Sequence, residues 1–121
     1  NDNGPSQVVL SGPVSVIQQA ERRCAEEGIK AKRLPVATAF HSGIVEPAVA
    51  PFRATLEGLR LKRPSLPVYA NATAQPYKAT AKELASVLSS QIASPVLFRE
   101  EIEAMYAAGA RIFVEVGPGN V

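Results

Sequence analysis

The stretch Leu34-Pro35-Val36-Ala37-Thr38-Ala39-Phe40-His41-Ser42-Gly43 carries the only histidine of the protein. Residues 34–39 alternate apolar and small side chains, and Pro35 argues against a preceding helix that continues, because its ring removes an N–H donor. After His41, apolar residues recur at the three- and four-residue intervals of an amphipathic helix, and Ser42 suits its N-cap. The sequence therefore predicts that His41 lies between a strand and a helix, at the edge of a sheet where ligands gather in α/β folds.

Composition excludes several classes of function. Apolar residues make up 46% of the 121 residues and charged residues 20%, which is ordinary for a globular domain. A net charge of +2 without a basic stripe gives no support for nucleic-acid binding. No apolar run approaches the roughly 20 residues that span a bilayer, and no signal peptide opens the chain. One cysteine and one histidine predict neither an internal disulfide nor a metal site, and we expect a cytoplasmic protein without membrane contact.

The remaining pattern alternates strands and helices. We expect a helix from Pro13 that ends at Gly28, and one that Thr80 caps together with Glu83. The inner face of the second helix is predicted to hold Leu84, Val87, Leu88 and Gln91. A further helix carries the stripe Phe98, Ile102, Met105 and Tyr106 and ends at Gly109. Strands are predicted over residues 7–11, 30–36, 68–71 and 112–116. Strands separated by helices indicate an α/β fold with parallel pairing.

Three motifs follow one another in an order that resembles a known family. Residues 34–42 precede Glu46-Pro47 and a helix, Asn3-Gly4-Pro5 leads to residues 8–12, and residues 113–121 read Phe-Val-Glu-Val-Gly-Pro-Gly-Asn-Val. Together they resemble malonyl-CoA:acyl carrier protein acyltransferases, which occur alone and as domains of fatty acid and polyketide synthases. The residues before the closing motif, together with Phe40, favour a type I polyketide synthase domain.

The resemblance implies a fold in two parts. The family has a large α/β-hydrolase-like subdomain and a small ferredoxin-like subdomain, with the active site between them. Residues 1–35 then form the later part of the small subdomain, and residues 36–121 form the carboxyl-terminal part of the large one. No Gly-x-Ser-x-Gly nucleophile motif occurs in the sequence, nor does the family's malonyl-binding arginine. The resemblance therefore implies that this chain supplies the catalytic histidine and that the serine lies upstream.

The same resemblance assigns roles to individual residues. It implies that His41 is the general base and that the main-chain carbonyl of Gln91 orients it, although a glutamine at a helix end needs no function. Asn1 and Asn3 match asparagines that line the family's cleft, while turn formation explains both almost as well. Ser42 is interpreted as a helix cap rather than as a second nucleophile.

Substrate choice is predicted from Ala39-Phe40-His41. In multidomain synthases this ending resembles the malonyl-selecting form, whereas methylmalonyl-selecting relatives carry a serine before the histidine. A bulky ring beside the base leaves less room for an α-methyl group. Such a methyl group is worth about 1 to 3 kcal/mol, so Phe40 biases the choice without fixing it. Thr38 departs from the commonest malonyl pattern, which has a histidine there.

Three functions from different classes remain open. The resemblance favours an acyltransferase that moves malonyl units from malonyl-CoA to the phosphopantetheine of an acyl carrier protein through an acyl-serine intermediate. It implies no cofactor held by this chain, and it names as partners the carrier protein, a ketosynthase and other synthase domains. The alternatives are a non-catalytic fragment that docks the carrier protein and an acyl hydrolase that uses the same serine and histidine. The basic residues Lys30, Lys32 and Arg33 are predicted to face solvent, and the alternative is contact with CoA phosphates or an acidic carrier protein.

Overall fold

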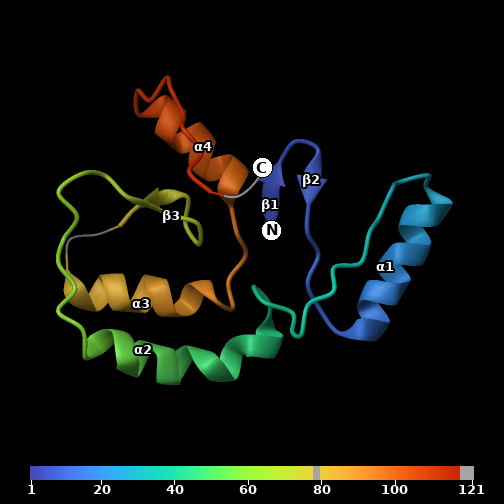
Figure 1. The fold of residues 1–121 in the computed structure, drawn as a ribbon, viewed down its shortest axis with the longest axis horizontal. Helices are drawn as coiled ribbons and strands as arrows, with labels where there is room; N and C mark the ends of the chain where they lie inside the picture. Colours follow the sequence, from blue (N-terminus) through green and yellow to red (C-terminus); the bar gives the residue numbers. More distant parts are fainter. Residues whose placement is uncertain (78–79, 118–121) are drawn as a thin grey trace.

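The computed structural model describes residues 1–77 and 80–117 (Figure 1). It is a mixed helical and stranded structure in which helices dominate. The elements in chain order are β1 (Asp2–Gly4), β2 (Gln7–Val8), α1 (Val14–Glu26), the 3₁₀ helix η1 (Gly43–Ala48), α2 (Val49–Glu57), β3 (Tyr69–Ala70), β4 (Gln75–Pro76), α3 (Ala81–Gln91) and α4 (Phe98–Ala107).

The predicted helices are present, and local chemistry fixes their ends. Pro13 precedes the first residue of α1, and Gly28 follows that helix with a φ of 69°. The Thr80 hydroxyl accepts a hydrogen bond from the Glu83 amide at 3.3 Å, as an N-cap does. Gly109 ends α4 with a φ of 109°, a conformation that a side chain disfavours.

The predicted parallel sheet is wrong for the described residues. β1 and β2 pair antiparallel, as do β3 and β4, so the structure holds two small hairpins. Residues 30–36 and 112–116 form no strand, and the strand predicted over 7–11 shortens to Gln7–Val8. A β-branched run becomes a strand only where a neighbour accepts and donates its backbone hydrogen bonds. The side chains of Ile112 and Val114 are 86% and 79% exposed, so no such neighbour covers them here.

The buried core is small and lies mainly between α2 and α3. The two helices run side by side in opposite directions (Figure 1), with Leu56, Leu84 and Ala85 buried between or beside them. Of the residues predicted for the inner face of α3, only Leu84 is buried. The other buried residues of this helix are Ala85 and Ser89. Small side chains at these positions let α2 approach closely, while the other predicted inner-face residues are half-buried: Val87, Leu88 and Gln91.

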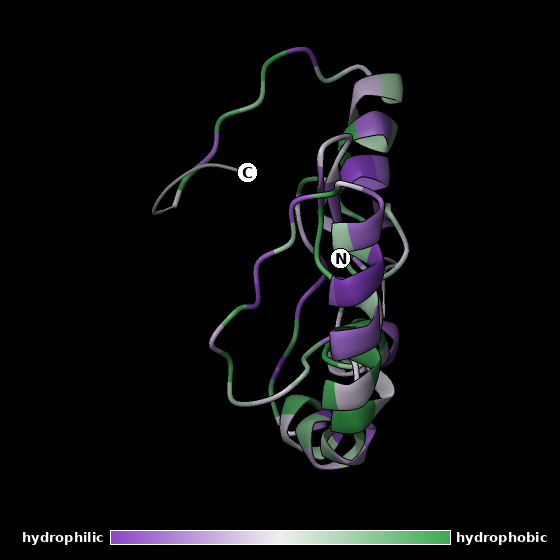
Figure 2. Cartoon of the chain, turned by 90° about the vertical axis from the view of Figure 1, so that its right-hand side faces the viewer, coloured by the Kyte–Doolittle hydropathy of each residue, from purple (hydrophilic) through white to green (hydrophobic). Residues whose placement is uncertain are grey.

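Outside this core the chain is open. α1 stands apart (Figure 1), and it has no buried residue. Figure 2 shows that the helices occupy one side of the molecule and that the segment after α4 leaves it on the other side. Among the described helices, none is long and apolar enough to cross a membrane.

Candidate active site

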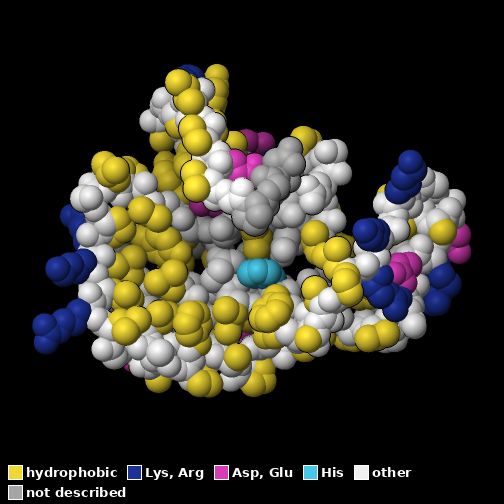
Figure 3. Space-filling view, viewed as in Figure 1, with side chains coloured by type: hydrophobic (Ala, Val, Ile, Leu, Met, Phe, Trp, Pro, Cys, Tyr) yellow, Lys and Arg dark blue, Asp and Glu magenta, His cyan; other side chains and the backbone are white. Residues whose placement is uncertain are grey.

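His41 is held by three main-chain carbonyls at the carboxyl end of α3. Its own amide donates to the Ile92 carbonyl at 2.8 Å. Its ring nitrogen Nδ1 lies 2.9 Å from the Gln91 carbonyl oxygen and 3.1 Å from that of Ser94. The backbone of His41 is left-handed, with a φ of 59°, which is uncommon for a residue with a side chain and is often found at functional sites. Figure 3 shows the imidazole at the surface near the centre of one face.

These contacts decide which ring nitrogen is available for chemistry. A carbonyl oxygen only accepts hydrogen bonds, so Nδ1 must carry the hydrogen that it shares with Gln91 and Ser94. In the neutral ring, Nε2 then holds the free lone pair. The arrangement therefore suits a base that takes a proton on Nε2.

The turn after α3 shapes this acceptor pair. The Ser94 amide donates to the Gln91 carbonyl at 3.2 Å, and the Ser94 hydroxyl donates to the Ser90 carbonyl at 2.7 Å. Carbonyls at a helix end lack intrahelical partners, so they are free to accept from His41. The sequence prediction paired His41 with Gln91 and missed Ser94. The available signal was Ser94-Pro95, which ends the helix and turns a second carbonyl towards the ring.

Ser42 acts as a cap. Its Oγ accepts from the Ile44 amide at 3.3 Å and donates to the Ala39 carbonyl at 2.6 Å. The predicted N-cap is confirmed, although the helix that it caps begins as the 3₁₀ helix η1 and becomes α2 at Val49. Because the hydroxyl hydrogen is committed to Ala39, the Ser42 side chain is not arranged as a nucleophile.

The predicted specificity residues flank the histidine in the chain. Phe40 is 56% exposed, and Ala39 is half-buried. The Phe40 side chain is therefore accessible at the surface. The predicted role in substrate choice stays a prediction.

Asn1 and Asn3 lie at the start of the chain, on the same side of the site as the α3 turn. The Asp2 amide donates to the Val96 carbonyl at 2.8 Å, which places β1 beside the segment that follows Ser94. The side-chain oxygen of Asn1 is buried and has no hydrogen-bond partner among the described residues. Asn3 is half-buried within β1. The structure thus brings Asp2 of β1 and His41 to one segment, residues 91–97.

Two more amide oxygens near this segment are buried without a partner in the described part of the chain. They belong to Gln91 and to Asn71, whose main-chain carbonyl accepts from the Leu97 amide at 2.9 Å. An unsatisfied buried polar group is costly and rare in native proteins. The side-chain oxygens of Asn1, Asn71 and Gln91 are therefore candidate acceptors for hydrogen bonds from a bound molecule or from another segment. Asn71 was missed by the sequence prediction, because one asparagine after a strand gives no distinctive pattern.

No group of three or more histidine, cysteine or acidic side chains within residues 1–77 and 80–117 is arranged to hold a metal ion. The predicted closing motif extends into residues 118–121, which lie outside the described residues.

Comparison with known proteins identifies the family. The family model of the acyl transferase domain matches residues 2–121. The chain belongs to the acyl transferase family. The malonyl CoA-acyl carrier protein transacylase of Haemophilus influenzae is 33% identical to this acyl transferase chain, over all of the chain and 39% of that protein. The polyketide synthase GfsA of Streptomyces halstedii is 37% identical, over 98% of the chain and 2% of that protein.

Solved structures agree with this assignment. The acyl transferase chain superimposes on the crystal structure of MCAT from Streptococcus pneumoniae with a TM-score of 0.84 and 32% identity, over 97% of the chain and 38% of that structure. The acyltransferase domain from the second module of the salinomycin polyketide synthase gives a TM-score of 0.73 and 35% identity, over 88% of the chain and 25% of that structure. The chain therefore spans well under half the length of these relatives.

Proposed function

We propose that this chain is the histidine-bearing portion of an acyltransferase that loads malonyl units from malonyl-CoA onto an acyl carrier protein. The observation that carries the proposal is the contact of His41 Nδ1 with the Gln91 and Ser94 carbonyls, which leaves Nε2 as a base. The relatives named as malonyl CoA-acyl carrier protein transacylases support the substrate and the partner. The nucleophilic serine lies outside these 121 residues.

The mechanism follows from what a serine nucleophile needs. A hydroxyl is weakly nucleophilic at neutral pH until a base within hydrogen-bond reach takes its proton. His41 Nε2 takes the serine proton as the serine attacks the thioester of malonyl-CoA, and it then protonates the departing CoA thiolate. In the second half-reaction His41 takes the proton of the phosphopantetheine thiol as the sulfur attacks the acyl-serine ester. The ester C–O bond then breaks, His41 returns this proton to the serine oxygen, and the acyl group stays on the carrier protein. The Gln91 and Ser94 carbonyls stabilise the imidazolium in both steps.

The roles of individual residues within this proposal follow from the resemblance to the acyltransferase family. Gln91 acts through its main-chain carbonyl, Phe40 and Ala39 border the malonyl group, and Asn1 and Asn3 line the cleft. Residues 1–35 belong to the ferredoxin-like subdomain and residues 36–121 to the α/β-hydrolase-like subdomain. In a synthase, the ketosynthase and other domains of the same polypeptide are further partners. The chain itself holds no cofactor, and we expect it in the cytoplasm.

Radiolabelled malonyl-CoA tests this function against its two alternatives. Incubated with the complete polypeptide that carries residues 1–121, the label should appear as a stable acyl-enzyme and should then move to added carrier protein. Rapid loss of the label to water would instead establish a hydrolase. Absence of any acyl-enzyme, together with retained carrier-protein binding, would establish a docking module and contradict the proposal.

A further inference from the structure

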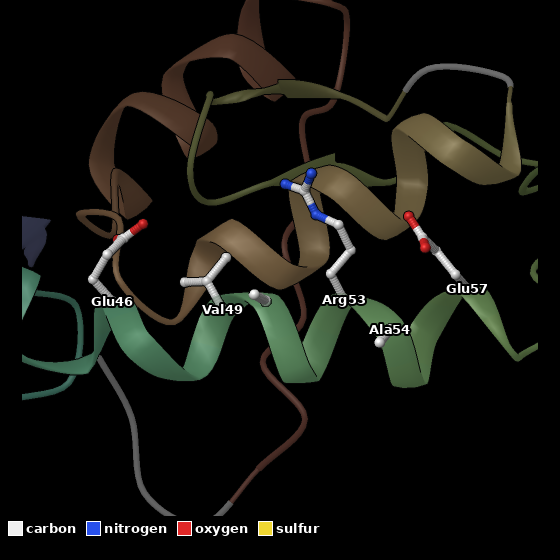
Figure 4. Close-up of a pocket in the computed structure, with 6 residues that line it drawn as sticks. Glu46, Val49, Arg53, Ala54 and Glu57 are labelled. Carbon is white, nitrogen blue, oxygen red and sulfur yellow. The ribbon is translucent and has the colours of Figure 1, made fainter.

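Arg53 ties the helix that follows His41 to the helix that holds it. The side chain is half-buried and extends from α2 towards α3 (Figure 4). Its Nε donates to the Ser89 hydroxyl and its Nη2 to the Ser86 hydroxyl, each at 3.2 Å. Ser86 and Ser89 are three residues apart and therefore share one face of α3. The rigid fork of the guanidinium thus engages two successive positions on the neighbouring helix.

Ser89 makes this contact specific. It is fully buried, with 0% exposure. Its hydroxyl donates to the Ser86 carbonyl at 3.0 Å, which leaves its oxygen lone pairs to accept from Arg53. Hydrogen bonds weaken steeply when their distance or angle changes, so the pair of contacts defines where Arg53 lies along α3.

Apolar packing alone would define that position less sharply. The groove beside Arg53 is lined by three apolar and two acidic residues of η1 and α2 (Figure 4): Glu46, Val49, Ala50, Ala54 and Glu57. The buried apolar residues of the two helices are Leu56 on α2 and Leu84 and Ala85 on α3. Hydrophobic attraction is non-directional and depends on buried area, so it allows one helix to slide along the other. The charge-assisted hydrogen bonds of Arg53 are directional, so they oppose sliding of α2 along α3.

The position of α2 along α3 affects His41 directly. The His41 ring is hydrogen-bonded to carbonyls at the end of α3, whereas its backbone continues through η1 into α2. Ser89 lies two residues before Gln91, and Arg53 lies twelve residues after His41. A slip of α2 along α3 by one residue would be about 1.5 Å. Such a shift, added to the 2.9 and 3.1 Å contacts of Nδ1, would take them beyond hydrogen-bond range.

We propose that Arg53, through Ser86 and Ser89, is a positioning residue that keeps the Nδ1–H of His41 on the Gln91 and Ser94 carbonyls. Arg53 touches no reacting group. It fixes the ring and its tautomer, so that Nε2 stays the base. The catalytic consequence rests on the proposed function, whereas the effect on the imidazole does not.

The test uses the complete polypeptide with four changes. Arg53→Met removes the donors at similar length, and Arg53→Lys supplies donors from a single nitrogen. The double variant Ser86→Ala with Ser89→Ala removes the acceptors. Arg22→Met is the control, because it removes an exposed arginine of α1. Two quantities are measured: the nitrogen chemical shifts of His41, assigned by their loss in His41→Ala, and the rate and KM of acylation by malonyl-CoA as functions of pH.

We expect Arg53→Met to shift the histidine away from a pure Nδ1–H tautomer and to lower the acylation rate about 10-fold, with KM within about 2-fold of the parent. Arg53→Lys should fall between Arg53→Met and the parent, the serine double variant should resemble Arg53→Met, and Arg22→Met should match the parent.

Unchanged nitrogen shifts in Arg53→Met would overturn the proposal, and if that variant fails to fold, unchanged shifts in the serine double variant would do so. If His41→Ala leaves acylation intact, the proposed function fails, while the nitrogen shifts still decide the role of Arg53.

Discussion

At the scale of single residues, the identity of the base was predictable and its surroundings were only partly so. The sequence offered one histidine at the start of a helical pattern, and the family resemblance paired it with the carbonyl of Gln91. The second carbonyl, from Ser94, was missed: Ser94-Pro95 marks the end of the helix in the sequence, but which carbonyl faces the ring depends on how the chain turns after α3. The same holds for Asn71 and Arg53, whose roles arise from contacts between segments that lie far apart in the sequence.

Phe40 carries the prediction on substrate choice. Its ring is exposed next to the base, where an α-methyl group of the substrate would compete with it for space. We expect Phe40→Ser to relax the discrimination against methylmalonyl-CoA about 10-fold, since one methyl group is worth about 1 to 3 kcal/mol. The ratio of kcat/KM for the two CoA thioesters measures this. An unchanged ratio would show that Phe40 does not border the acyl group.

At the scale of elements, the helices were predictable and the strands only in part: β3 lies within the predicted strand 68–71 and β2 within 7–11, whereas residues 30–36 and 112–116 form no strand. Helix ends are set by local chemistry, as at Thr80, Gly28 and Gly109, so the sequence locates them to within a residue or two. A strand needs partners that its own residues do not supply. Residues 112–116 have strong strand character and yet form no strand in this structure.

The cap of α3 allows a stability prediction. Thr80 accepts from the Glu83 amide, and its hydroxyl donates to the Glu83 carboxylate at 2.6 Å. Thr80→Ala should lower the free energy of unfolding by about 1 kcal/mol, the usual value for a lost N-cap. Urea unfolding of the complete polypeptide measures it, with Thr55→Ala on α2 as the matched control away from a helix start. Equal stability of Thr80→Ala and the parent would contradict the assigned cap.

Glu101 on α4 predicts a pH dependence. Its side chain is 7% exposed, and its Oε2 has no hydrogen-bond partner among the described residues. Burial raises the pKa of Glu101 above its ordinary 4.5, so between 4.5 and the raised pKa the folded state binds more protons than the unfolded state. The stabilisation present below pH 4.5 is therefore lost as pH rises through this window, and the loss is complete above the folded pKa.

Glu101→Gln should remove this fall in stability, whereas the exposed neighbour Glu100 should give a control, Glu100→Gln, that retains it. The measurement is the free energy of unfolding in denaturant at several pH values from 4 to 7. An unaltered pH slope in Glu101→Gln would contradict the role assigned to the buried carboxyl.

At the scale of the whole molecule, the small core and the large apolar exposure have one explanation. The chain spans 38% of the Streptococcus pneumoniae structure on which it superimposes. Its exposed apolar side chains include Val8, Leu10, Val36, Ile112 and Val114, which belong to the segments predicted as strands. We therefore expect these segments to form a parallel sheet only where further residues of an acyl transferase domain supply neighbouring strands, which composition and periodicity within 121 residues do not reveal.

Hydrogen–deuterium exchange tests this explanation. In the complete polypeptide, the amides of residues 112–116 should exchange slowly, because a neighbouring strand then accepts their hydrogen bonds. In the isolated chain the same amides should exchange rapidly, while those of α3 between Leu84 and Leu88 serve as the internal reference. Rapid exchange of residues 112–116 in both would show that these residues form no strand in the complete polypeptide either.

The role of His41 as the base of an acyl transfer reaction underlies every other assignment, and the acylation rate of His41→Ala decides it. In the complete polypeptide, a single turnover with malonyl-CoA should form acyl-enzyme at least about 100-fold more slowly than in the parent, because a general base contributes at least this much. The circular dichroism spectrum should stay the same. A His41→Ala variant that is acylated at a near-normal rate would show that His41 is not the base.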